Sequence, residues 1–234
     1  MDEKVEQIVT WLKKIYGDKP AVIAVSGGVD SALALTLLVK ALGKDKVTPI
    51  CLPYHDQDAK DARTIIGWNG VLQNMEEVNI GEMVDQVAAK LKIEEDELRK
   101  GNVMARIRMI VVFDYAKKLG ALVCGTENKS EHYLGYFTRF GDAASDVEPI
   151  SGLYKTEVWE MAKVLGLPEV FYTKPPSAGL WQGQTDEAEM GFTYAEADKV
   201  LKNEIEGIEP EIVARVRQMV KQNEFKRAVP YVIE

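Results

Sequence analysis

The sequence has few cysteines, no long hydrophobic run and no excess of positive charge. Its 234 residues include only Cys51 and Cys124, and each ends an apolar run that is typical of a strand. We therefore expect two buried free thiols rather than a disulfide framework. No apolar stretch approaches the length of a membrane span, and the N-terminal residues lack a signal-peptide pattern. These absences favour a cytoplasmic protein without membrane contact.

The charge balance argues against a nucleic-acid partner. The formal net charge is −8, whereas a broad nucleic-acid surface needs a basic face. An anionic small molecule would instead require a few clustered arginines and lysines. The chain shows no internal repeat, low-complexity run or linker, so we expect a single domain over 1–234, with C-terminal helices and a tail from about residue 193.

Strand and helix patterns alternate along the chain, which predicts an α/β fold with a doubly wound parallel sheet. The expected strands cover 21–25, 47–52, 78–80 and 121–124. The expected helices cover 3–16, 32–42, 56–72, 82–91, 95–118, 155–165, 193–206 and 209–222. Pro49 predicts an edge position for the second strand or a place among its first residues, and Gly101 predicts a break in the long helix.

The most informative stretch is the first strand together with Ser-Gly-Gly-Val-Asp-Ser at 26–31. Paired glycines permit positive φ and close approach of a ligand to the backbone, and the helix that follows directs free N–H groups at the turn. This arrangement predicts a phosphate site, with Asp30 placed to hold an accompanying Mg²⁺. The turn is neither a Walker A loop nor a G-x-G-x-x-G loop. The hexapeptide resembles the signature of the ATP pyrophosphatases.

A second polar loop, Gly-Thr-Glu-Asn-Lys-Ser-Glu at 125–131, follows the fourth strand. In a doubly wound sheet, ligands lie beyond the carboxyl ends of the strands, so this loop should meet the turn after the first strand. Thr126 is expected to face the cleft there. Glu131 is either a second carboxylate that shares Mg²⁺ with Asp30, or an ordinary glutamate in the first turn of a helix.

The helix at 103–113 is apolar on all sides except for Arg106 and Arg108. Such a helix is buried in the core or at a subunit contact. A buried guanidinium without an anionic partner is costly, so these arginines need either an internal carboxylate or a ligand phosphate.

Two irregular regions in the second half of the chain carry further candidates. The first gathers Arg139, Asp142, Asp146 and Lys155, side chains suited to phosphates, sugar hydroxyls or amines. The second, 175–187, contains glycines, a tryptophan and Ser177, and this composition is typical of a mobile lid over a ligand.

In order, these motifs resemble the ammonia-dependent NAD synthetases, a family of ATP pyrophosphatases, over about residues 20–230. The motifs more specific to that family are Ala-Arg-Ile-Arg-Met, Gly-Tyr-Phe-Thr-Arg-Phe-Gly-Asp, Leu-Tyr-Lys-Thr-Glu-Val, Pro-Ser-Ala-Gly-Leu-Trp and Gln-Thr-Asp-Glu. The resemblance implies a Rossmann-like fold of the adenine nucleotide alpha hydrolase type. It also implies amidation of deamido-NAD by ammonia through an adenylate, with release of AMP and pyrophosphate, in a homodimer.

The resemblance assigns a role to each matching position. The residues it implies for ATP are Ala24, Val25, Ser26, Gly27, Gly28, Val29, Asp30, Ser31, Thr126, Lys155 and Ser177. The residues it implies for deamido-NAD are Arg106, Arg139, Asp146, Phe225 and Lys226. Asp30 and Glu131 are implied as the ligands of Mg²⁺.

Two positions depart from the family pattern. Arg139 stands where the family often has lysine, which keeps the charge and changes the geometry. Phe225 stands where the family commonly has histidine before Lys226, so the role of that histidine does not carry over directly, and ring stacking by Phe225 is the alternative. The chain also has no segment for a glutamine amidase domain, so free ammonia or a separate donor is the expected nitrogen source.

Two other functions remain open from the sequence. A related ATP pyrophosphatase, such as a tRNA-thiolating or GMP-forming enzyme, would share the first motif, but thiolation needs a reactive cysteine and a basic surface. A nucleotide sensor would bind ATP without turnover. The pair of carboxylates favours chemistry over sensing, because a sensor needs no shared metal.

Overall fold

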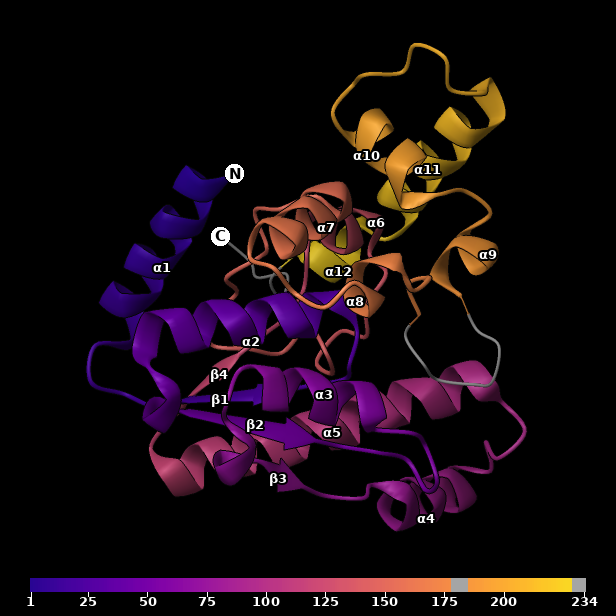
Figure 1. Cartoon of the computed structure of the whole chain (residues 1–234). Coiled ribbons are helices and arrows are strands. Elements are labelled where there is room, and N and C mark those ends of the chain that lie inside the picture. The colour runs from indigo at the N-terminus through magenta and orange to yellow at the C-terminus, as the bar shows by residue number, and fades with distance from the viewer. Residues whose placement is uncertain (178–184, 229–234) are drawn as a thin grey trace, which may run out of the picture.

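Four short parallel strands form the centre of the molecule in the order β3-β2-β1-β4 (Figure 1). This computed structural model describes residues 1–177 and 185–228. The strands are β1 (Ala21–Ala24), β2 (Val47–Cys51), β3 (Glu76–Glu77) and β4 (Leu122–Cys124). Ala21 of β1 pairs with Val47 of β2 on one side and with Leu122 of β4 on the other. The chain therefore reverses its direction of winding between β1 and β4, which is where ligands bind in such sheets.

Helices cover both faces of the sheet, as the alternating pattern predicts (Figure 1). One face carries α1 (Asp2–Tyr16), α2 (Val29–Leu42), α3 (Lys60–Trp68) and α7 (Lys155–Val164), and the other carries α4 (Gly81–Leu91) and α5 (Glu97–Leu119). Successive residues of β1 point to opposite faces: Ile23 packs with the first group of helices and Val22 with the second. Both side chains are fully buried.

A third and smaller apolar cluster, in addition to those on the two faces of the sheet, is formed mainly by the C-terminal part of the chain. It contains Leu134, Phe192, Tyr194 and Val216. Its helices are α6 (Lys129–Leu134), α9 (Asp186–Met190), α10 (Tyr194–Leu201) and α11 (Pro210–Gln222). In Figure 1, α10 and α11 lie beyond α6 and α7, on the side away from the sheet. The short elements are two 3₁₀ turns, Lys44–Lys46 and Leu72–Asn74, and the helices α8 (Val170–Thr173) and α12 (Glu224–Arg227).

Two predictions about β2 and its neighbour were wrong. Pro49 lies in an interior strand, where it pairs with Ile23, rather than at an edge. The strand tolerates it because β3 pairs only with Ile50 and Cys51, so no backbone acceptor of β3 lies opposite the missing N–H. The third strand is Glu76–Glu77 rather than 78–80.

Some helix bounds also differ from expectation. The helix expected over 56–72 is the shorter α3, followed by a 3₁₀ turn. The expected break near Gly101 is absent, since α5 runs without interruption from Glu97 to Leu119. Glycine in a helix interior costs about 1 kcal/mol, which is small beside the packing of a long helix on a sheet. The helix expected over 193–206 is α10, which begins with a capping box between Thr193 and Glu196.

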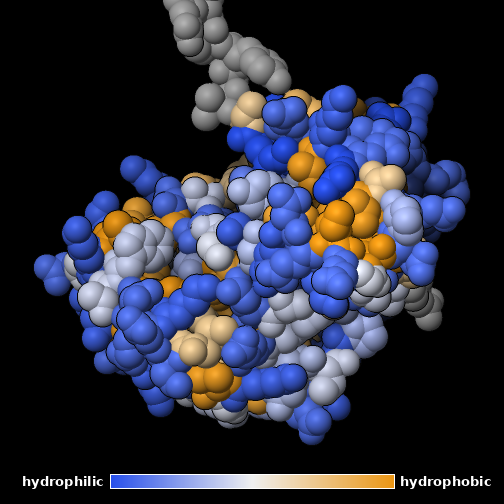
Figure 2. Space-filling view, turned by 90° about the horizontal axis from the view of Figure 1, so that it is seen from above, coloured by the Kyte–Doolittle hydropathy of each residue, from blue (hydrophilic) through white to orange (hydrophobic). Residues whose placement is uncertain are grey.

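The surface and the cysteines agree with the expectations from composition. Cys51 and Cys124 are both buried and free. Seen from above, polar residues cover most of the surface, with separate hydrophobic patches between them (Figure 2). No helix in the described ranges has the length and apolar character needed to span a bilayer.

Candidate active site

The turn after β1 is held in shape by its own serines. Ser31 Oγ donates to the carbonyl of Gly28 at 3.1 Å and accepts from the Ser26 N–H at 3.2 Å. Gly27 has φ +85° and lies against α3, where a Cβ atom would come within 2.8 Å of the Ala62 nitrogen. Glycine is therefore required at this position. The turn leads into α2, whose N-terminus has no side-chain cap, so its N–H groups remain available to an anion.

Asp30 and Glu131 come together, and Lys155 lies between them. Lys155 Nζ is 2.6 Å from Asp30 Oδ2 and 2.9 Å from Glu131 Oε1, and the Lys155 side chain is 2 % exposed. Burial alone would lower the pKa of Lys155, but the two carboxylates outweigh it and raise that pKa well above its usual range. The lysine is therefore a fixed ammonium ion, and the two acids that were expected to share a metal are already joined by a cation.

The donor set still suits Mg²⁺. Two carboxylates close to the glycine turn match the ion's preference for one or two acids together with phosphate oxygens and water. In residues 1–177 and 185–228, no three His, Cys, Asp or Glu side chains are grouped as a metal site. Any metal here would thus depend on ligand oxygens in addition to Asp30 and Glu131.

Asn128 connects the Asp30 carboxylate to the backbone of Glu131. Its side chain is fully buried, and its Oδ1 accepts from the Glu131 N–H at 3.0 Å, which caps α6. Its Nδ2 donates to Asp30 Oδ1 at 2.8 Å. Sequence reasoning gave Asn128 no role and did not include 129–134 among the expected helices, although asparagine is a common helix N-cap.

Helices α9 and α10 contribute side chains that lie next to Glu131. The Tyr194 hydroxyl is fully buried and lies 3.2 Å from Asp186 Oδ2 and 3.5 Å from Glu131 Oε1. The Tyr136 hydroxyl donates to Glu189 Oε2 at 2.7 Å. These residues were not predicted. They link the described end of the expected lid to Glu131, whereas residues 178–184 of that lid lie outside the described ranges.

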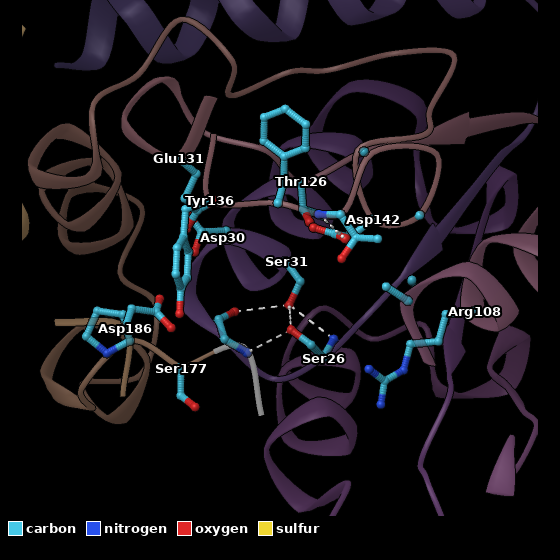
Figure 3. A pocket seen from close by; sticks show the side chains of 18 of the residues that line it. Ser26, Asp30, Ser31, Arg108, Thr126, Glu131, Tyr136, Asp142, Ser177 and Asp186 are labelled. Carbon is cyan, nitrogen blue, oxygen red and sulfur yellow. Dashed lines mark hydrogen bonds between the residues drawn. The ribbon is translucent and has the colours of Figure 1, made fainter. Parts of the chain in front are cut away.

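The glycine turn, Asp30, Glu131 and Lys155 line one large cavity of about 1110 Å³ beyond the carboxyl ends of β1, β2 and β4. In Figure 3, Ser26 and Ser31 lie near the middle, with Arg108 on one side and Ser177 and Asp186 on the other. The residues predicted for ATP that line it are Ala24, Val25, Ser26, Gly27, Gly28, Val29, Asp30, Ser31, Thr126, Lys155 and Ser177. All the positions predicted for ATP therefore meet in one place.

The two arginines of α5 have different surroundings. Arg108 lines the cavity; its Nε donates to the Leu52 carbonyl at 3.1 Å and its Nη2 to Gln57 Oε1 at 2.9 Å. Within the described residues, no carboxylate oxygen lies within 4.0 Å of its guanidinium. Burial lowers the pKa of Arg108, and the more distant Asp142 opposes this. Arg106 is exposed instead, which corrects the prediction that both arginines are buried.

Of the positions predicted for deamido-NAD, the cavity of one chain contains only Lys226. Its ammonium donates to the carbonyls of Gly135 and Phe137 at 2.7 and 3.0 Å. The other predicted residues, Arg106, Arg139, Asp146 and Phe225, do not line this cavity. Arg106 and Arg139 are connected, since Arg106 Nη2 donates to the Arg139 carbonyl at 3.2 Å. Asp146 Oδ2 accepts from the Val123 N–H at 2.8 Å, so this carboxylate supports β4.

Acidic side chains gather at the loop after β4. Glu148 Oε2 accepts from the Glu127 N–H at 3.1 Å, and Glu148 Oε1 accepts from the Ser145 hydroxyl at 2.7 Å. Burial raises the pKa of Glu148 to about 7 and that of Glu127 to about 8. Burial also raises the pKa of Asp142, which lines the cavity nearby. Burial therefore favours the protonated form of all three carboxyl groups.

Comparison with known proteins gives consistent matches. A family model described as NAD synthase matches residues 3–230. An NH(3)-dependent NAD(+) synthetase of Pyrococcus furiosus is 42 % identical, with 96 % of this chain and 93 % of the relative covered. The enzyme of the same name from Methanosarcina mazei is 43 % identical, with coverage of 93 % and 91 %.

Solved structures agree over almost the whole chain. An NMN synthetase of Francisella tularensis superposes with a TM-score of 0.90 at 34 % identity, covering 99 % of this chain and 98 % of the other. An NH3-dependent NAD synthetase of Campylobacter jejuni, in complex with the nitrate ion, gives 0.83 at 29 % identity, with coverage of 100 % and 99 %.

Proposed function

This chain belongs to the NAD synthase family, and from that premise we propose that it is a ligase that converts deamido-NAD to NAD with ATP and ammonia. The nicotinate carboxylate attacks the α-phosphorus of ATP, forming an adenylate and releasing pyrophosphate. Ammonia then attacks the acyl carbon, giving the amide and AMP. The observation that carries the proposal is the meeting of the glycine turn with Asp30, Glu131 and Lys155 in one cavity.

The residues of the site suit the first step. A carboxylate is a poor electrophile, so the enzyme must stabilise the charge that develops on the departing pyrophosphate. We propose that the N–H groups at the start of α2 and the Ser26 and Ser31 hydroxyls bind the phosphates. The ammonium of Lys155 adds a fixed positive charge beside them.

We further propose that Asp30 and Glu131 hold Mg²⁺ when ATP is present. The ion would supply positive charge to the polyphosphate oxygens. The support is the donor set, since both acids lie within hydrogen-bond distance of one cation, Lys155 Nζ.

The proposed binding mode for deamido-NAD uses two subunits. Arg106 and Ile110 are four residues apart on α5 and share its exposed face, where Ile110 is 56 % exposed. We propose a homodimer that covers this face and brings Arg106 and Arg139 to a substrate that extends out of the cavity. Sedimentation of the wild type and of Ile110→Asp tests this: a monomeric wild type would contradict it.

A second candidate substrate is favoured by one observation. Four residues expected to bind the dinucleotide lie outside the cavity of a single chain, and a similar structure is named for the synthesis of NMN. The corresponding substrate would be nicotinate mononucleotide, which lacks the adenylate half. The ratio of kcat/KM for deamido-NAD and nicotinate mononucleotide decides between them, and we expect it to favour deamido-NAD.

The central test is pyrophosphate release from ATP in the presence of Mg²⁺, deamido-NAD and ammonium, with each component omitted in turn. We expect release beyond one equivalent per active site to depend on all of them, and NAD to form in equal amount over many turnovers. ATP binding without release would support a nucleotide sensor. A Cys51→Ala/Cys124→Ala double variant should keep the activity; its loss would favour a thiolating enzyme.

The location and the partners follow the same proposal. We propose a cytoplasmic enzyme, because both cysteines are buried free thiols of the kind that persist in a reducing compartment. The net charge of −8 supports small-molecule substrates rather than a nucleic acid.

A further inference from the structure

Asp198 is a buried carboxylate that lies outside the cavity. It belongs to α10 and is 1 % exposed. It accepts hydrogen bonds from the Ser130 hydroxyl, from the Thr156 N–H at 2.9 Å and from the Thr156 hydroxyl at 2.7 Å. No lysine or arginine nitrogen of residues 1–177 and 185–228 lies within 4.0 Å of it. A charge in this position depends on these donors for its stability.

The donors belong to the two helices that carry Glu131 and Lys155. Ser130 lies in the first turn of α6, directly before Glu131, and Thr156 lies in the first turn of α7, directly after Lys155. The same Ser130 hydroxyl oxygen accepts from the Lys155 N–H at 2.9 Å. Because N–H groups in a first helical turn have no partner within the helix, Asp198 and Ser130 satisfy two of those of α7. The positive end of the α7 dipole also favours the carboxylate.

We propose that Asp198 is a positioning residue for the reaction, acting through α6 and α7 on Glu131 and Lys155. Its carboxylate joins the first turns of these helices, and so it sets the distance between Lys155 Nζ and Glu131 Oε1. Asp198 does not line the cavity, so it does not touch the substrate. The inference rests on the proposed function, because it concerns the same reaction centre.

Helix α10 provides a matched control. At its start, Glu196 Oε2 accepts from the Thr193 N–H and from the Thr193 hydroxyl, both at 2.8 Å. This capping box is exposed. Among the described residues, the hydrogen bonds of Glu196 are made with Thr193, and none of them reaches α6 or α7. Glu196→Ala therefore weakens the same helix without removing the link to the site.

The experiment compares Asp198→Asn with Glu196→Ala in the full-length protein. We measure kcat, the KM for deamido-NAD, the Mg²⁺ concentration at half-maximal rate and the melting temperature. Asp198→Asn should lower kcat by about 10- to 100-fold and raise the half-saturating Mg²⁺ concentration, since small displacements of reacting groups have effects of this size. Glu196→Ala should lower the melting temperature and leave both kinetic values near those of the wild type.

Ser130→Ala keeps the test decisive if Asp198→Asn fails to fold. It removes the hydroxyl shared by Asp198 and Lys155, and it should shift kcat and Mg²⁺ dependence in the same direction. In the double variant Asp198→Asn/Ser130→Ala, the two effects on kcat should not add, because both substitutions disrupt the same connection between Ser130 and Asp198. The proposal is overturned if the folded variants keep wild-type kcat and Mg²⁺ dependence, or if activity falls only in proportion to melting temperature in all of them. An inactive wild type would instead contradict the proposed function.

Discussion

Asn128 donates a hydrogen bond to Asp30 at 2.8 Å and thereby joins the loop after β4 to the first turn of α2. The same side chain caps α6 through the Glu131 N–H. A single amide thus contacts both the Asp30 carboxylate and the first turn of the helix that carries Glu131. Five predictions follow from this cluster and its surroundings.

Replacing Asn128 should separate its two roles. Asn128→Ser keeps an oxygen that can cap α6 but loses the donor to Asp30, whereas Asn128→Ala loses both. We expect both variants to lower kcat, and only Asn128→Ala to lower the free energy of unfolding, by about 1 kcal/mol. Kinetics and urea unfolding measure this. Wild-type activity in Asn128→Ser would show that the bond to Asp30 is dispensable.

Neutralising either carboxylate should reduce turnover while the protein stays folded. For Asp30→Asn and Glu131→Gln we expect kcat to fall by about 100-fold or more, the usual cost of losing a charge-stabilising group. Circular dichroism checks the fold. Glu6→Gln, in an exposed ion pair with Lys40, is the control and should be unchanged. A variant with the wild-type rate would remove its carboxylate from the proposed metal site.

Lys155→Met should make stability depend on Mg²⁺. Without the ammonium, Asp30 and Glu131 face each other as buried like charges, and we expect unfolding to become easier by about 3 kcal/mol. Binding of Mg²⁺ to the folded state would recover part of this. Melting temperatures with and without Mg²⁺ measure the effect. If Mg²⁺ shifted the melting temperature equally in the wild type and the variant, this would contradict the idea that the Lys155 ammonium takes the place of a cation between Asp30 and Glu131.

Arg108→Met should weaken substrate binding more than it weakens the fold. The guanidinium lines the cavity, and among the residues that the structure describes it donates to the neutral oxygens of Leu52 and Gln57. Both substrates are polyanions, so we expect the KM for at least one of them to rise about tenfold, which corresponds to about 1.4 kcal/mol. Arg108→Lys should be intermediate. Unchanged KM values for ATP and deamido-NAD would show that the charge of Arg108 does not contribute to the binding of either substrate.

Stability should fall as the pH rises from about 5 to 8. Burial raises the pKa of Glu148 to about 7 in the folded state, from 4.5, so the folded protein binds a proton that the unfolded chain has released. The contribution is fully present below 4.5 and is lost as the pH passes through about 7. Glu148→Gln keeps an acceptor for the Glu127 N–H and should flatten the slope of unfolding free energy against pH, by up to about 1.4 kcal/mol per pH unit. Urea unfolding at several pH values checks this, and identical slopes would contradict it.

The sequence was sufficient for the centre of the fold and for the glycine turn that lines the cavity. The apolar strand, the glycine pair and the helix that follows are local signals, and their outcome depends little on the rest of the chain. The parallel topology then determined which loops meet, so Asp30 and Glu131 were expected to lie together. Lys155 was assigned to the same site only by the family resemblance.

The outer part of the site depends on packing that no local pattern encodes. Arg106 and Arg108 are two positions apart on α5 and point in different directions, and only the docking of α5 on the sheet decides which one reaches the cavity. Tyr194 and Asp198 come from a helix that the sequence predicted, but their contacts with α6 and α7 join segments far apart in the chain. Pro49 was misplaced for a similar reason, because the short β3 leaves its nitrogen unopposed.

The pairing of Ala21 with Leu122 has a consequence for how the protein is made. During synthesis on the ribosome, the glycine turn and β2 emerge long before β4, so one edge of β1 stays open to other chains until the second half of the sheet arrives. Chaperone binding to the nascent chain should therefore be strongest while the polypeptide ends between the two strands, and it should decline once residues beyond Cys124 have left the exit tunnel.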